Sequence, residues 1–159
     1  ISKFKSMQHI LNRHQQLNCD LKTAWLFFSN PNNLAKITPK DMAFTVLSKD
    51  INETIYEGME IEYTVSPILK IPFYWKTMIT QVDFEKSFTD FQVKGPYKLW
   101  NHFHEFIPNE NGVLMKDTVT YELPLSFLGT IAHKLVVQNK VNAIFNFREK
   151  ILNQQFNKN

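Results

Sequence analysis

The sequence predicts an α+β fold, in which a curved antiparallel sheet of about seven strands wraps around a long C-terminal helix. Three observations support this class. Two short helical patterns, within residues 21–37, follow a single strand pattern. Between residues 44 and 123, apolar and polar residues alternate with the period of strands. From residue 126 to about residue 156, apolar residues recur near helical spacing and no proline interrupts them.

The N-terminal part is predicted to form one strand and then two short helices. The strand is predicted at His9–Leu17, which alternates loosely. Asp20 is a typical N-cap, because its side-chain oxygen can accept from the free backbone N–H groups of a helix over residues 21–28. Pro31 fits the first turn of a second helix over residues 31–37. No further helix is expected before the sheet.

Six more strands are predicted to follow as an antiparallel meander, which Pro124 ends. Their ranges are 44–49, 59–68, 73–84, 88–94, 99–107 and 114–123. Gly95-Pro96 marks one of the turns. Asn111-Gly112 marks the last, and this dipeptide is a strong hairpin signal because both residues tolerate positive φ.

The last hairpin also predicts a register. If its turn is centred on Glu110-Asn111, His104 lies opposite Asp117 and Trp100 lies opposite Tyr121. One face then carries mostly apolar residues and is predicted to point into the core: Trp100, His102, His104, Phe106, Met115, Asp117, Val119 and Tyr121. The other face is predicted to be solvated: Lys116, Thr118, Thr120 and Glu122.

Composition narrows the class of protein. Hydrophobic residues make up 43% of the chain and aromatic residues 14%, which excludes disorder of the whole. The 159 residues contain no internal repeat or linker, so a single domain over residues 1–159 is predicted. The net charge is +3, but Lys and Arg are scattered and form no basic stripe, so no nucleic-acid partner is predicted.

A cytoplasmic location is expected. No apolar run approaches the roughly 20 residues of a membrane span, and no signal-peptide pattern is present, so integral membrane association is not predicted. The single cysteine, Cys19, cannot form an internal disulfide, which favours a reducing compartment. Cys19 has no activating neighbour and is expected to pack rather than react. Monomer and homodimer both remain open.

His102 and His104 share their strand face with two aromatic residues, and three interpretations stay open. In the first, they are structural or orient a ligand by donating to a carboxylate or carbonyl. In the second, His104 acts in acid–base catalysis and Asp117 sets its tautomer, with His102 as a further candidate. In the third, both histidines and a carboxylate bind a metal, but no HExxH or CxxC spacing supports this. No metal or other cofactor is therefore predicted.

Three more residues are candidates for the same site. The Gly95-Pro96 turn is expected to bring Asp90 and Gln92 beside the histidines. Arg148 lies on the long helix, where it either extends along the helix edge to solvent, clamps an acidic ligand group or pairs with a carboxylate of the sheet. No GxSxG, GxGxxG or P-loop motif is present, so hydrolases and nucleotide-binding proteins of those kinds are not supported.

The motifs reached so far resemble those of a known superfamily. They are Phe27, Pro31 and Leu34 with Ile37-Thr38-Pro39; Gly58, Trp75 and Ile79-Thr80; Phe88-x-Asp90-x-Gln92-x-x-Gly95-Pro96-Tyr97 leading into Trp100-x-His102-x-His104-x-Phe106; and Asp117-x-Val119-x-Tyr121-x-x-Pro124, Gly129 and Phe145-x-x-Arg148. Together they resemble the SRPBCC superfamily, the START/Bet v 1-like helix-grip proteins, and within it the polyketide cyclase/dehydrase-like ligand-binding branch. The resemblance spans nearly the whole chain.

The resemblance implies a helix-grip fold that binds a hydrophobic small molecule, such as a lipid or polyketide, between the sheet and the C-terminal helix. Trp75, Trp100, Tyr121 and Phe145 are then expected to form apolar walls. His102, His104 and Asp117 are expected to bind the polar end, with Asp90, Gln92 and Arg148 beside them. A minority of relatives catalyse cyclisation or dehydration, so an enzyme that uses His104 and Asp117 as acid and base is the alternative. A regulatory interaction protein is the second alternative.

Overall fold

The computed structural model describes residues 8–51, 54–66, 70–124 and 131–158. Seven strands form one antiparallel sheet in the order β1-β7-β6-β5-β4-β3-β2. They are β1 (Gln8–Leu17), β2 (Thr45–Val46), β3 (Glu60–Val65), β4 (Phe73–Asp83), β5 (Ser87–Lys94), β6 (Leu99–Asn109) and β7 (Gly112–Glu122). The helices are α1 (Leu21–Phe28), the 3₁₀ helices η1 (Pro31–Ile37) and η2 (Lys40–Met42), and α2 (Ile131–Phe156). The predicted α+β class is confirmed.

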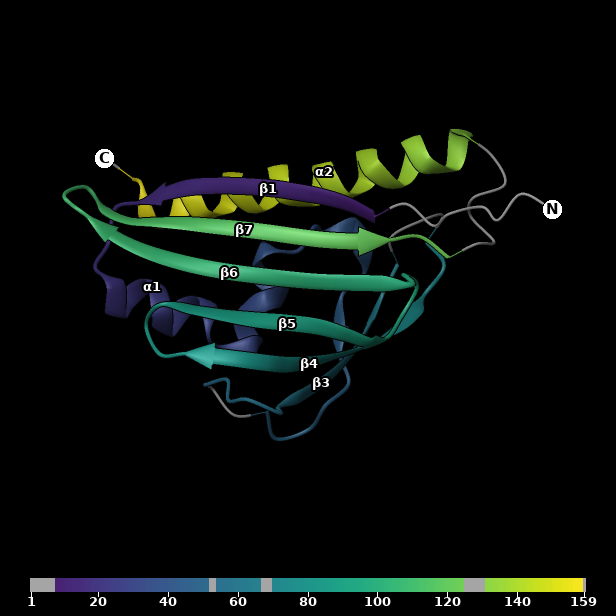
Figure 1. Ribbon diagram of the computed structural model, residues 1–159, viewed down its shortest axis with the longest axis horizontal. Coiled ribbons are helices and arrows are strands. Elements are labelled where there is room, and N and C mark those ends of the chain that lie inside the picture. Colours follow the sequence, from purple (N-terminus) through teal and green to yellow (C-terminus); the bar gives the residue numbers. More distant parts are fainter. Residues whose placement is uncertain (1–7, 52–53, 67–69, 125–130, 159) are drawn as a thin grey trace.

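The sheet curves, and the helices lie on one side of it (Figure 1). Figure 1 shows α2 running along β1 and α1 lying behind β5 and β6. The α2 helix contacts β1 and η1, and α1 contacts β6 and β7. Both helices therefore cover the inner face of the sheet. No helix among the described residues is long and apolar enough to cross a membrane.

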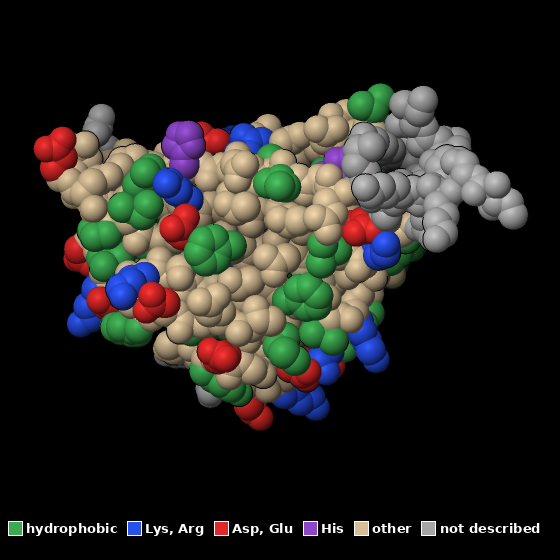
Figure 2. Space-filling model, in the orientation of Figure 1, with side chains coloured by type: hydrophobic (Ala, Val, Ile, Leu, Met, Phe, Trp, Pro, Cys, Tyr) green, Lys and Arg blue, Asp and Glu red, His purple; other side chains and the backbone are tan. Residues whose placement is uncertain are grey.

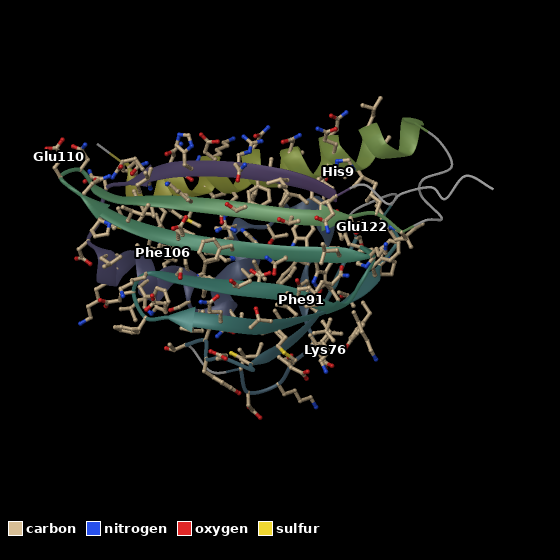
Figure 3. All side chains as sticks on the ribbon, viewed as in Figure 1. His9, Lys76, Phe91, Phe106, Glu110 and Glu122 are labelled. Carbon is tan, nitrogen blue, oxygen red and sulfur yellow. The ribbon has the colours of Figure 1, made fainter. Side chains whose placement is uncertain are left out.

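The hairpin register is confirmed. His104 pairs with Asp117 and Trp100 with Tyr121, and Asn109 faces Gly112 across the turn. Glu110 marks the tip of this hairpin in Figure 3. Gly112 has φ of 118°, and a Cβ there would lie 2.3 Å from the carbonyl oxygen of Leu17, so any larger residue would be strained and crowded.

The first helix is confirmed at its predicted bounds, but the segment after it differs from the prediction. Asp20 caps α1 by accepting from the backbone N–H of Thr23 at 2.7 Å. The second helix forms as η1, a 3₁₀ helix. The structure adds η2, which the sequence analysis missed: the N–H of Met42 donates to the carbonyl of Pro39. Pro39 is the residue that precedes this short helix.

The predicted strand over residues 44–49 is wrong in length, because only Thr45–Val46 pairs regularly. Beyond it, the N–H groups of Leu47 and Ser48 both donate to the carbonyl of Glu62, at 2.8 and 3.2 Å, which breaks the regular ladder. The first residues of the predicted C-terminal helix, 126–130, lie outside the described residues.

The predicted exposure of Glu122 is also wrong. Glu122 is 7% exposed, and its carboxylate forms an ion pair with the ammonium group of Lys98. Glu122 is labelled in Figure 3 at the end of β7 opposite the hairpin tip. At this end of the sheet, a residue on the outward-facing row can still be covered by its neighbours.

Two apolar clusters fill the inner side of the sheet. In the first, Trp25 of α1 meets Phe88 and Phe106 edge to face, with ring centroids 6.0 and 5.7 Å apart. In the second, Trp75 and Trp100 meet edge to face at 5.5 Å. We call these the Trp25 cluster and the Trp100 cluster. The candidate site lies on the strands that carry both.

Candidate ligand-binding site

A cavity of about 180 Å³ lies between the inner face of the sheet and α2. Its walls come from α1, η1, the strands β3 to β6 and α2. Aromatic rings form much of this wall, among them Phe28, Tyr63, Trp75, Tyr97, Trp100 and Phe145. Four acidic or basic residues of the strands and α2 interrupt the wall: Asp90, His102, His104 and Arg148. A small apolar cavity with a few convergent polar groups is the usual form of a small-molecule site.

These polar residues belong to a buried cluster that joins three neighbouring strands to α2. Asp90 lies on β5, His102 and His104 on β6, and Asp117 on β7. Arg148 reaches the cluster from α2. We call these five residues the His–Asp–Arg cluster. All four sheet residues lie on the inner face. His102 and His104 are two residues apart on β6, and Asp90 and Asp117 pair with them across the ladders.

Each histidine donates to the carboxylate that lies diagonally across from it. Nε2 of His102 lies 2.8 Å from Oδ1 of Asp117, and Nε2 of His104 lies 2.7 Å from Oδ2 of Asp90. In the strand register, however, His102 faces Asp90 and His104 faces Asp117. The two hydrogen bonds therefore cross the ladder. Diagonal neighbours on one face are within reach of long side chains, and sheet twist affects which of them meet.

The remaining ring nitrogens also point to carboxylates. Nδ1 of His102 lies 3.5 Å from Oδ2 of Asp90. Nδ1 of His104 lies 3.1 Å from Oδ1 of Asp117, but the alignment is not that of a hydrogen bond. The predicted His104–Asp117 pair is thus in contact, whereas the hydrogen-bond partner of His104 is Asp90. Every ring nitrogen of the two histidines is within 3.5 Å of a carboxylate oxygen.

Arg148 is buried and does not extend to solvent. Its side chain is 9% exposed, and Nη2 donates to Oδ1 of Asp117 at 3.3 Å. The guanidinium group also lies over the rings of Phe28 and Phe145, 5.4 and 5.8 Å from their centroids. Of the three interpretations of Arg148, the structure shows the ion pair with a carboxylate of the sheet.

Both carboxyl groups are held ionised despite their burial. Burial alone would raise the pKa of Asp117, but the charge of Arg148, the hydrogen bond from His102 and the close contact with His104 hold it well below the usual value of 3.8. Burial also acts to raise the pKa of Asp90, yet the charge of His102 and the hydrogen bond from His104 leave that pKa lowered. At neutral pH the cluster therefore carries two negative charges.

The two histidines shift in opposite directions. Burial lowers the pKa of His102, and the neighbouring His104 lowers it further. Burial also acts against charge on His104, but contacts with Asp117 and Asp90 raise its pKa above the usual 6.5. Arg148 supplies a positive charge beside the two carboxylates, and the shifted pKa values favour protonation of His104 over protonation of His102.

Asp90, His102 and His104 are also the residues that could hold a metal ion, since one ligand atom from each lies within 4.8 Å of the others. Nitrogen and carboxylate oxygen are suitable ligands for zinc. In the structure, Nε2 of His104 is hydrogen-bonded to Asp90 and Nε2 of His102 to Asp117, so a metal ion would have to replace these contacts.

The structure places seven of the ten predicted site residues at the cavity and three elsewhere. Asp117 lies behind the histidines, and Tyr121 packs in the Trp100 cluster. Gln92 instead braces a turn: its Nε2 donates to the carbonyl of Tyr97 at 2.7 Å, and its Oε1 accepts from the Tyr97 N–H at 3.2 Å. Gly95 permits this, because a Cβ there would lie 2.3 Å from Oε1 of Gln92.

Several polar residues of the cavity wall are not among the predicted site residues, including Tyr63, Thr77 and Tyr97. Tyr63 and Thr77 meet through their hydroxyl groups at 3.1 Å, and Nε1 of Trp75 donates to the same Thr77 oxygen at 3.1 Å. Tyr97 lines the wall next to them. Strand alternation places Tyr63 and Thr77 on the inner face, so that signal could have found both. Tyr97 lies in a turn, where no periodicity applies.

Sequence comparison gives no assignment: no protein-family model matches the chain, and no curated protein matches it. Solved structures do match in shape. Protein Ms6760 from Mycobacterium smegmatis has a TM-score of 0.67 at 15% identity, over 92% of this chain and 89% of that one. Norcoclaurine synthase from Thalictrum flavum, in complex with dopamine and hydroxybenzaldehyde, has a TM-score of 0.62 at 13% identity, over 94% and 88%.

A third similar structure is the major latex-like protein 151 of Panax ginseng, with a TM-score of 0.58 at 17% identity, over 87% of this chain and 95% of that one. Such identities establish the fold alone. The chain has the helix-grip fold of the SRPBCC superfamily, the Bet v 1-like fold.

Proposed function

We propose that this protein binds a hydrophobic small molecule in the cavity between the sheet and α2. The observation that carries the proposal is a cavity of about 180 Å³ with largely aromatic walls and a buried polar cluster on one side. Aromatic walls supply most of the binding free energy by removing apolar surface from water. The polar residues then orient the ligand.

Native mass spectrometry of freshly purified protein, with organic extraction, tests this proposal. The expected result is a bound small molecule that extraction releases. Ile144 lines the cavity from α2, whereas Asn146 is exposed on the same helix. Ile144→Trp should therefore fill the cavity and abolish retention, and Asn146→Trp should leave it unchanged. Equal retention in both variants would place the ligand elsewhere and contradict the proposal.

Acid–base catalysis is the second candidate, favoured by the 2.7 Å contact between His104 and Asp90 at the cavity. Against it, every ring nitrogen of both histidines lies within 3.5 Å of a carboxylate oxygen, so a substrate would have to compete with Asp90 and Asp117 for them. The test is turnover of an enolisable or polyketide-like substrate. Turnover that is lost in His104→Ala would support an enzyme; identical rates would exclude His104 as its base.

A regulatory interaction role remains the third hypothesis. In the view of Figure 2, hydrophobic and charged side chains are interspersed and no single-type patch dominates. A pull-down that recovers no partner, from protein that clearly retains a ligand, would count against this role.

A further inference from the structure

We infer that the cavity selects an uncharged molecule of about one ring whose hydroxyl group donates a hydrogen bond to Asp90. This inference rests on the proposed binding function and names the chemistry of the ligand. It depends on which polar atom of the wall is free, on the size of the cavity and on the charges beside it.

Asp90 is the polar residue that is available to a ligand. Its side chain is 20% exposed, compared with 6–9% for the other four members of the His–Asp–Arg cluster. Its Oδ2 atom receives both histidine contacts. Among the described residues, Oδ1 of Asp90 has no hydrogen-bond or ion-pair partner. A carboxylate oxygen can only accept, so the ligand must donate.

The other polar atoms of the His–Asp–Arg cluster are less available to a ligand. The ring nitrogens of His102 and His104 face carboxylates. Asp117 is not part of the cavity wall. The Nε atom of Arg148 is buried without a hydrogen-bond partner, so a ligand does not reach it unless the side chain moves. Within this cluster, Oδ1 of Asp90 is therefore the acceptor that a ligand can reach.

The volume of the cavity matches a ligand of about one ring. An apolar protein cavity of about 150 Å³ holds a benzene molecule, and this cavity measures about 180 Å³. A substituted benzene is therefore the matching size. Trp75 and Trp100 supply ring faces and edges on the wall, which suit aromatic contacts.

The charged side chains at the cavity wall disfavour an ionised ligand. Asp90 and Arg148 both line the cavity. A ligand carboxylate would lie against the Asp90 carboxylate, and a ligand ammonium would bring a further positive charge beside the Arg148 guanidinium. Either ion would also lose its hydration among aromatic walls. A hydroxyl group donates without adding charge.

Isothermal titration calorimetry with four probes of matched ring size tests the inference. They are 4-ethylphenol, 4-ethyltoluene, 4-ethylbenzoate and 4-ethylbenzylammonium. We expect 4-ethylphenol to bind about tenfold or more tightly than each of the others, because a hydrogen bond to a charged group is worth at least about a factor of ten. Equal affinity for 4-ethyltoluene, or tighter binding of either ion, would overturn the inference but not the proposed function.

Asp90→Asn supplies the second test. Its amide oxygen is expected to accept from His104, which turns the NH₂ group toward the cavity and removes the acceptor. The preference for 4-ethylphenol over 4-ethyltoluene should then fall to less than about threefold. Asp83→Asn, the same change at an exposed position at the end of β4, should keep the full preference. A preference unchanged in Asp90→Asn would overturn the inference.

The probe series uses the wild-type protein, so it still tests the preference for an uncharged hydroxyl ligand if Asp90→Asn fails to fold. If none of the four probes binds at its solubility limit, the single-ring class is wrong. Native mass spectrometry would then still report whether the cavity retains a different molecule, and so whether the proposed function stands.

Discussion

The Trp25 cluster and the His–Asp–Arg cluster lie next to each other on the same inner face. Apolar packing stabilises the first, whereas hydrogen bonds and ion pairs stabilise the second. On β5, Phe88 belongs to the first cluster and Asp90 to the second, two residues along. On β6, Phe106 and His104 stand in the same relation. On both strands, the inner-face side chains therefore change from apolar to polar within two residues.

The two clusters are both buried, but their contributions to stability should depend differently on pH. Apolar packing in the Trp25 cluster does not depend on protons, so its contribution to stability should be independent of pH. The His–Asp–Arg cluster contains groups whose pKa values are shifted in the folded state, so its contribution to stability should vary with pH. The predictions below test that difference, from the largest expected effect to the smallest.

Trp25→Ala should lower the free energy of unfolding by about 4 kcal/mol, because it removes a large ring and leaves a cavity. Trp25 is 1% exposed. The loss, measured by urea unfolding, should be equal at about pH 5 and about pH 8, since both conditions leave these rings uncharged. Leu26→Ala, at a neighbouring position that is 54% exposed, should cost well under about 1 kcal/mol. A loss that varies with pH would contradict the comparison.

Asp117→Asn should lower the free energy of unfolding by about 3 kcal/mol at neutral pH, because it leaves the buried Arg148 charge without its partner. The pKa of Asp117 is lower in the folded state than its usual 3.8. Its stabilising effect is thus complete above 3.8 and disappears as the pH falls through the folded-state pKa. The gap between wild type and variant, from denaturant unfolding, should narrow on that acid side.

His104→Gln should lower the free energy of unfolding by about 1–2 kcal/mol near pH 6, and by less at higher pH. The pKa of His104 is raised above 6.5 in the folded state, so its stabilising charge is fully present below 6.5 and disappears as the pH rises through the folded-state pKa. NMR titration of the imidazole signals checks the sign directly. His104 should titrate above 6.5 and His102 below it; the reverse order would contradict the assigned charges.

Lys98→Met should have the smallest effect, below about 1 kcal/mol, although it removes an ion pair with Glu122. The Lys98 side chain is 50% exposed, so water screens its charge. Added salt should reduce the difference further in thermal unfolding. A loss as large as that of Asp117→Asn would show that exposure does not distinguish the two pairs.

Much of the fold could be predicted because local signals specify it. Asn111-Gly112 determined the register of the β6–β7 hairpin, and Asp20 marked the start of α1. The β2 strand was predicted too long, because Leu47 and Ser48 both donate to the carbonyl of Glu62, which ends the regular ladder in a way that the alternation of residues does not reveal.

The candidate site was harder to predict than the fold. Alternation put His102, His104 and Asp117 on the inner face, which the structure bears out through their burial. It could not show that each imidazole bonds to the diagonal carboxylate, because side-chain rotamers and sheet twist decide that. Gln92 also faces inward, yet its amide is taken by Tyr97, a contact between a strand and a turn that no spacing rule reveals.

The crossed hydrogen bonds of β6 have a consequence for strand pairing during folding. If β6 slipped by one residue against its neighbours, both imidazoles would turn to the outer face. Asp90 and Asp117 would then be left ionised inside, and Arg148 could form an ion pair with only one of them. Misaligned β5–β6–β7 pairings are thus penalised electrostatically as well as by lost packing, so the two histidines help this sheet to reject wrong alignments.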